Sequence, residues 1–240
     1  PPAATPLGEA VEPPDAEKLR GIPWLFAHSA TNSIFCTFTV FGSVFVLFLS
    51  HLGLPKTQIG LVLSLMPFAL VLALFISPLV ARAGFKRIYL WFWTSRNFVV
   101  FGLLFTPWVL GRFGPRAAFL YVAGIIAVFA LCRAVGMTAW MPWSLHTVPH
   151  GIRGKYHATS SVLSTLAGAA AVLVAGYVIG RFSGLSGFMG LMAVGAAIGV
   201  FSALCIAFVP GGRPSFEPLG LAHRWALLKA AYRIWPYPRA

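Results

Sequence analysis

Residues Ser77–Arg87 read SPLVARAGFKR, a short basic segment between two long apolar stretches of the chain. The stretch before it covers about Ile59–Val80, and the stretch after it about Ile88–Leu110. Each is long enough to cross a bilayer as a helix, which needs about 20 apolar residues at 1.5 Å per residue. The cations between them therefore predict a turn at one membrane face, where charged side chains stay hydrated.

Four more apolar runs of similar length share this pattern. They cover about 29–52, 117–140, 158–180 and 187–209. None of the runs alternates polar and apolar residues, so we do not expect membrane strands. The predicted fold class is all-α, a polytopic membrane protein with six transmembrane helices.

The composition supports a membrane protein. The 240 residues are 58% hydrophobic and only 10% charged, and a soluble domain would need more charge to cover its surface. The formal net charge is +13, but the cations lie in the gaps between apolar runs. Membrane orientation explains that placement, so we expect no nucleic-acid partner.

Carboxylates are confined to the two ends of the chain, at Glu9, Glu12, Asp15, Glu17 and Glu217. Carboxylate-based acid–base catalysis and carboxylate-ligated metal sites therefore lack their residues in the apolar region. The cysteines, Cys36, Cys132 and Cys205, have no partner spacing typical of a zinc site. We predict a protein that is not an enzyme and that carries no metal or cofactor.

The distribution of cations sets the orientation of the helices. Counting alternate gaps and the two ends, twelve cations fall on one side and four on the other. The richer side is expected to face the cytoplasm together with both termini. We predict a disordered cytoplasmic tail over 1–28, a six-helix bundle over 29–209, and a cytoplasmic linker over 210–240. The linker shows the pattern of a basic amphipathic helix, although a disordered tail with chance periodicity remains open.

Two segments carry a family resemblance. Leu79, Arg82, Gly84, Lys86 and Arg87 match the loop G-x-L-x-D-R-x-G-R-K-R that joins the second and third helices of major facilitator superfamily transporters. Ser77, Ala81 and Phe85 depart from it. Arg153-Gly154, after Pro149, resembles the entry to the fifth helix of that family.

The resemblance implies the N-terminal half of a twelve-helix permease, and we expect this chain to be a fragment of it. Such a half works with a C-terminal six-helix bundle, in the lipid bilayer of a bacterial inner membrane, to move a small solute by alternating access. Two alternatives remain open: a non-transporting scaffold or receptor, and a stand-alone half that pairs with another subunit.

The resemblance also implies a gating loop, made of Ala81, Arg82, Gly84, Lys86 and Arg87. In the family, the acid at the position of Ala81 helps to hold the inner gate closed. Alanine cannot make that contact, so we expect this gate to be held differently.

Two arginines lie inside apolar runs, Arg96 and Arg133. A charge at that depth is costly unless it faces an aqueous path or reaches the interface. Both readings stay open for each arginine. If both face one cavity, an anionic solute is favoured, because no nearby acid neutralises them. The other half could supply that acid instead. Because this region holds no carboxylate, any proton coupling must reside in the other half, or transport is uncoupled.

Small polar residues recur along the first apolar run. Asn32, Cys36, Thr39 and Ser43 follow steps of four, three and four, which places them on one helix face. They contact solute, or they join helices within the lipid. The predicted substrate-binding residues are therefore Asn32, Thr39, Ser43, Arg96 and Arg133.

Other residues suggest structural roles. Trp91, Trp93, Trp108, Trp140 and Trp143 fall near predicted helix ends and predict an interfacial belt. Gly168, Gly176 and Gly180 are expected to allow close helix approach. The histidines, including His28 just before the first run, are not placed as a proton relay.

Overall fold

The computed structural model describes residues 15–210, except the side chains at 15–16, 72–74, 77–79 and 81–83. Within these residues the chain is helical and contains no strand, which confirms the all-α class. The elements are α1 (Asp15–Phe38), α2 (Ser43–His51), α3 (Lys56–Ala83), α4 (Phe85–Phe101), η1 (Gly102–Phe105), α5 (Thr106–Thr147), η2 (His150–Ile152), α6 (Arg153–Arg181) and α7 (Ser186–Ala207).

Several of these helical segments have the dimensions of membrane spans. By length and composition, 4 segments of the described chain could cross a membrane: Glu17–His51, Phe85–Thr147, His150–Arg181 and Ser186–Ala207. Lys56–Val71 is a shorter apolar helix. These segments indicate a membrane-embedded protein.

Two glycines divide the longest helical stretches. Gly84 is the single residue between α3 and α4, with φ at 89°, where a side chain would be strained. The predicted basic loop is therefore a one-residue hinge. Gly114 lies inside α5 with φ at 82° and ψ at 178°, which are not helical angles. Residues 106–113 thus form a segment separate from 115–147.

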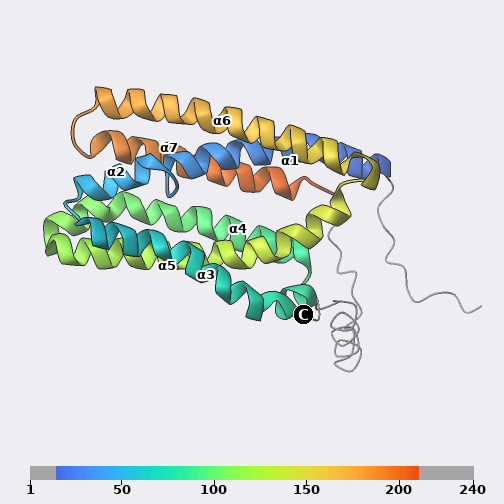
Figure 1. The fold of residues 1–240 in the computed structure, drawn as a ribbon, viewed down its shortest axis with the longest axis horizontal. Coiled ribbons are helices and arrows are strands. Elements are labelled where there is room, and N and C mark those ends of the chain that lie inside the picture. The colour runs from blue at the N-terminus through green and yellow to red at the C-terminus, as the bar shows by residue number, and fades with distance from the viewer. Residues whose placement is uncertain (1–14, 211–240) are drawn as a thin grey trace, which may run out of the picture.

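The helices pack in a fixed order, α6, α1, α7, α4, α5 and α3, each mainly against the next. Figure 1 shows the result as two layers, with α6, α1, α2 and α7 above α4, α5 and α3. Backbones of the two layers approach closely where α4 meets α7. Elsewhere aromatic side chains fill the space between layers, among them Phe35 and Phe129, which are fully buried.

The described helices change one predicted boundary. Helix α1 begins at Asp15, so residues 15–28, which we assigned to the tail, form its first part. The remainder of the predicted tail, 1–14, and the predicted amphipathic helix in the linker lie outside the described residues.

Two structural expectations from sequence are wrong in part. Trp93 and Trp143 are buried inside the bundle and so cannot face lipid, whereas Trp91 and Trp108 are exposed. Gly168 does lie against another helix, because a Cβ there would sit 2.9 Å from Ser33 Oγ. Gly176 and Gly180 have open space beside them.

Candidate functional site: a buried arginine between the two helix layers

Arg96 is the most deeply buried cation of the described chain, with 1% of its surface exposed. It lies on α4 three residues after Trp93, so both side chains share a helix face. The guanidinium carbon stacks 3.4 Å from the centre of the Trp93 ring. The rings of Phe35 and Phe129 lie 5.2 and 5.6 Å away. An aromatic enclosure of this kind stabilises a cation by about 2 kcal/mol or more when water is excluded.

Two asparagine oxygens hold the guanidinium in place. Arg96 Nε donates to Asn97 Oδ1 at 3.2 Å, and Nη2 donates to Asn32 Oδ1 on α1. The Asn97 amide is itself fixed, because its Nδ2 donates to the Gly199 carbonyl on α7 at 2.6 Å. Asn97 must therefore point its oxygen at Arg96. The structure thus connects α1, α4 and α7 through one polar group.

Arg133 approaches the same region from α5. Its side chain is half-buried, and its guanidinium carbon lies 5.2 Å from the Phe41 ring. Phe41 contacts Phe129, with ring centres 6.1 Å apart, and Phe129 is the ring that faces Arg96. The two guanidinium groups are close enough for their positive charges to repel each other, and both charges interact electrostatically with the thiol of Cys36. Both predicted arginines therefore face one aromatic cluster.

A break in the first apolar run lies beside this cluster. Helix α1 ends at Phe38 and α2 begins at Ser43. The break divides the predicted polar stripe. The Thr39 hydroxyl is fully buried and donates back to the Phe35 carbonyl at 2.7 Å, while Ser43 is exposed at the start of α2. Among the stripe residues, the structure brings Asn32 and Cys36 to the arginines, and it does not bring Thr39 and Ser43 there.

A second polar cluster, absent from the sequence prediction, centres on His28. This histidine is buried within α1, one helical turn before Asn32. Its Nδ1 lies 2.9 Å from the Ser202 carbonyl on α7, and its Nε2 lies 2.9 Å from the Tyr89 hydroxyl on α4. A neutral ring satisfies both contacts if Nδ1–H donates to the carbonyl and Nε2 accepts from the hydroxyl. In the sequence, the four-residue step from His28 to Asn32 already indicates that both side chains share one face of a helix.

The histidine cluster supports a structural role. The Ser202 hydroxyl donates to the His28 backbone carbonyl at 3.1 Å, so α1 and α7 are joined by two kinds of bond. A protonated ring would add a second buried positive charge near Arg96. This arrangement favours a neutral histidine that joins helices.

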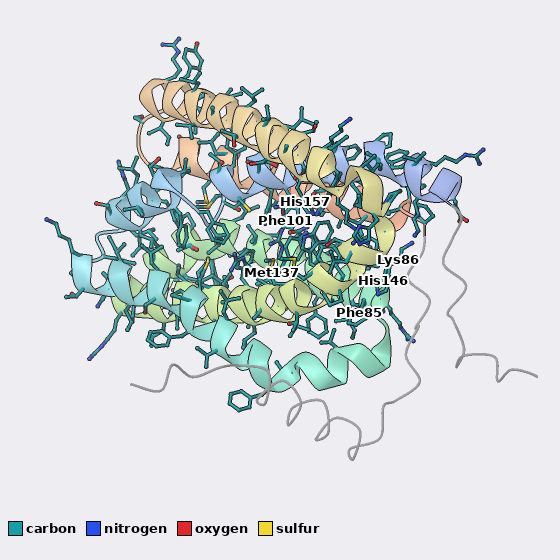
Figure 2. The ribbon with its side chains drawn as sticks, turned by 45° about the vertical axis from the view of Figure 1, so that its right-hand side comes forward. Phe85, Lys86, Phe101, Met137, His146 and His157 are labelled. Atoms are coloured by element: carbon teal, nitrogen blue, oxygen red, sulfur yellow. The ribbon has the colours of Figure 1, made fainter. Side chains whose placement is uncertain are left out.

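The predicted gating segment lies at the end of the bundle where α3 joins α4. Ala81 and Arg82 belong to the last turn of α3, and their side chains are outside the described set. Lys86 donates from Nζ to the backbone carbonyls of Ala207 and Val209, where α7 ends. Arg87 is exposed. Figure 2 shows Lys86 at the same end of the molecule as His146, near the end of α5.

A seam of serines joins α1 to α6. Ser29 Oγ lies 2.8 Å from the hydroxyls of both Ser160 and Ser164, and Ser33 donates to the Ser164 carbonyl at 2.7 Å. Such hydrogen bonds hold helices together in a membrane. No group of His, Cys, Asp or Glu in the described part of the chain could hold a metal ion.

Comparisons with protein-family models, with curated proteins and with solved structures gave no significant match. The resemblance to the major facilitator superfamily therefore depends on the two loop motifs and the pattern of apolar runs alone.

Proposed function

We propose that this chain is the N-terminal half of a carrier of the major facilitator type, which moves a small solute across a membrane by alternating access. Arg96 is the observation that carries the proposal. It is a fully enclosed cation in an apolar, all-helical chain, held between helix layers rather than at an end. Ionisable groups at such depth are costly and commonly mark a solute or ion path.

The helix arrangement supports six membrane crossings. We count α1 with α2 as the first, α3 as the second, and α4 through residue 113 as the third. The rest of α5, then α6 and α7, complete the set. In Figure 1 the start of α1, the α3–α4 hinge and the end of α7 lie at one end of the bundle. That end carries Lys18, Arg20, Lys86 and Arg87. We therefore place it on the cytoplasmic side of a bacterial plasma membrane.

The packing order supports a partner bundle. Because α6 and α3 stand at opposite ends of the order, each packs mainly on one neighbour and has a side that the other described helices leave uncovered. Helix α6 exposes large apolar side chains such as Leu166 at 63% and Leu173 at 76%. Lipid covers part of this surface. We propose that a C-terminal six-helix bundle, of the same or another chain, covers the rest and encloses the solute path.

This half supplies no proton-coupling carboxylate, since none lies between Lys18 and Phe216. The neutral hydrogen-bond pattern of His28 also disfavours a relay there. We therefore propose that this half contributes solute contacts and no catalytic or proton-transfer step.

Uptake into proteoliposomes tests the proposal. The natural-length protein is reconstituted and offered anionic, neutral and cationic solutes, with and without a proton gradient. We expect saturable uptake of at least one solute, and we expect Arg133→Leu to reduce it. Arg112→Leu, at an exposed arginine, serves as the matched control. Folded protein that transports nothing would overturn the carrier proposal in favour of a scaffold or receptor.

A further inference from the structure

The arginine cluster is rich in donors and poor in acceptors. The oxygens of Asn32 and Asn97 both accept from Arg96 already. Arg133 meets an aromatic ring and makes no hydrogen bond within the described residues. The indole nitrogen of Trp93 is buried and also has no partner there. What remains at this place is a set of donors and positive charge.

No carboxylate of the described residues compensates the positive charge. Arg96 and Arg133 repel each other, and the sequence holds no carboxylate from Lys18 to Phe216. An unpaired buried cation costs several kcal/mol, which the aromatic contacts offset only in part. A bound anion would remove both the repulsion and the unpaired donors.

The surroundings restrict the kind of anion. The rings of Phe35, Phe41 and Phe129 lie beside the two guanidinium groups. An oxyanion head can take bidentate bonds from arginine, and an apolar or aromatic body can pack on these rings. A sugar needs acceptors as well as donors, and a cation needs acceptors. Few acceptors remain here, since each asparagine oxygen already accepts one bond from Arg96.

We propose that this cluster binds the head group of a small organic anion, a carboxylate or similar oxyanion with an apolar body. The proposal rests on the proposed carrier function and names its solute class. Arg96 and Arg133 hold the oxyanion head, and the phenylalanine rings contact the body.

Cys36 offers a reporter at the site, because it is half-buried and lies within reach of both arginine charges. The test uses natural-length protein in which Cys36 is the only cysteine, with Cys132→Ser and Cys205→Ser among the replacements. The rates at which Cys36 reacts with an anionic and a cationic methanethiosulfonate are measured. The anionic-to-cationic rate ratio is then divided by the same ratio for a free thiol in solution. We expect this normalised ratio to favour the anionic reagent by at least about tenfold, since two nearby cations attract it.

The same measurement shows whether a carboxylate of the protein already neutralises the two arginines. A normalised ratio near one would show that a carboxylate from elsewhere in the protein neutralises the arginines, and it would overturn the proposal. A ratio that stays high in the double variant Arg96→Gln/Arg133→Gln would also overturn it, because the charge would then come from another group.

Protection gives the second readout. Acetate, benzoate and inorganic phosphate are tested against labelling of Cys36 by N-ethylmaleimide, with glucose and tetraethylammonium as controls. We expect benzoate to slow labelling saturably, more strongly than acetate or phosphate, and Arg133→Gln to abolish the effect. Equal protection by glucose, or none by any anion, would refute an anion site. Labelling needs no transport, so protection without uptake would end the carrier proposal alone, and uptake without protection would end the anion proposal alone.

Discussion

Gly199 on α7 gives a sharp test of the packing that supports the arginine site. A Cβ built there would lie 2.5 Å from Cδ2 and 2.9 Å from Cε2 of Phe35. Ordinary carbon contacts are about 3.5–4.0 Å, so Gly199→Ala must displace the ring by about 1 Å. Phe35 is fully buried and faces Arg96, which leaves the ring little space to move.

The expected loss of stability follows from two opposing effects. Overpacking a buried site costs about 1–3 kcal/mol. Alanine in a helix interior gains about 0.5–1 kcal/mol over glycine. We therefore expect Gly199→Ala to lower the free energy of unfolding by up to about 2.5 kcal/mol, the difference of these two effects.

Gly190 is the matched control, because it lies on the same helix and a Cβ added there would meet nothing within 4 Å. Gly190→Ala should be stabilising, since only the helix-propensity gain remains. The two variants share the helix-propensity gain and differ by the overpacking cost of about 1–3 kcal/mol. At about 2–4 °C per kcal/mol for a chain of this size, their Tm values should differ by roughly 2–12 °C. Tryptophan fluorescence during heating in detergent measures this. Equal Tm values for the two variants would refute the close packing of Phe35 on α7.

Three further substitutions test the remaining contacts, two of them by the same Tm assay and one by amide exchange. His28→Phe leaves the Tyr89 hydroxyl without its buried partner and should cost about 1–3 kcal/mol, so an unchanged Tm would argue against that hydrogen bond. Lys86→Met should speed amide exchange at the end of α7, because the Lys86 Nζ donates to backbone carbonyls there. Arg87→Met, at an exposed residue, should leave that exchange unchanged, and equal exchange in the two variants would contradict the Lys86 contact. Ser164→Ala should lower stability by about 0.5–1 kcal/mol, as expected for one interhelical hydrogen bond, and a gain in Tm would contradict the serine seam.

Apolar runs predicted the helices well because membrane burial dominates their energetics. The ends of α6 and α7 lie within a few residues of the expected limits, apart from the earlier start of α6 at Arg153. The start of α1 was missed, since Asp15–Arg20 is polar and lacks the apolar pattern on which the prediction depended. The break after Phe38 was missed as well, because residues 39–42 read TVFG, carry no charge and leave the apolar run uninterrupted.

The site was predicted in part. Depth along the helices identified Arg96 and Arg133 as unusual, and their shared aromatic cluster came only from the structure. The prediction assumed a continuous helix, which places Thr39 on the same face as Asn32. In the structure α1 ends at Phe38, and the Thr39 hydroxyl donates to the Phe35 carbonyl instead. Gly199 lies four residues after Gly195, a spacing that favours close helix approach, and this signal in the sequence was overlooked. Partners from distant helices, such as Ser202 for His28, have no local sequence signature.

Solute uptake by an Arg96 variant tests most directly whether this arginine lies on a transport path. Natural-length protein in proteoliposomes is compared with Arg96→Leu and Arg96→Lys, with Tm measured for each to confirm a folded state. We predict that the leucine variant loses saturable uptake of an organic anion, while the lysine variant keeps a measurable part of it. Uptake by folded Arg96→Leu at the rate of the unmodified protein would contradict the central claim and would leave Arg96 as a helix-joining residue.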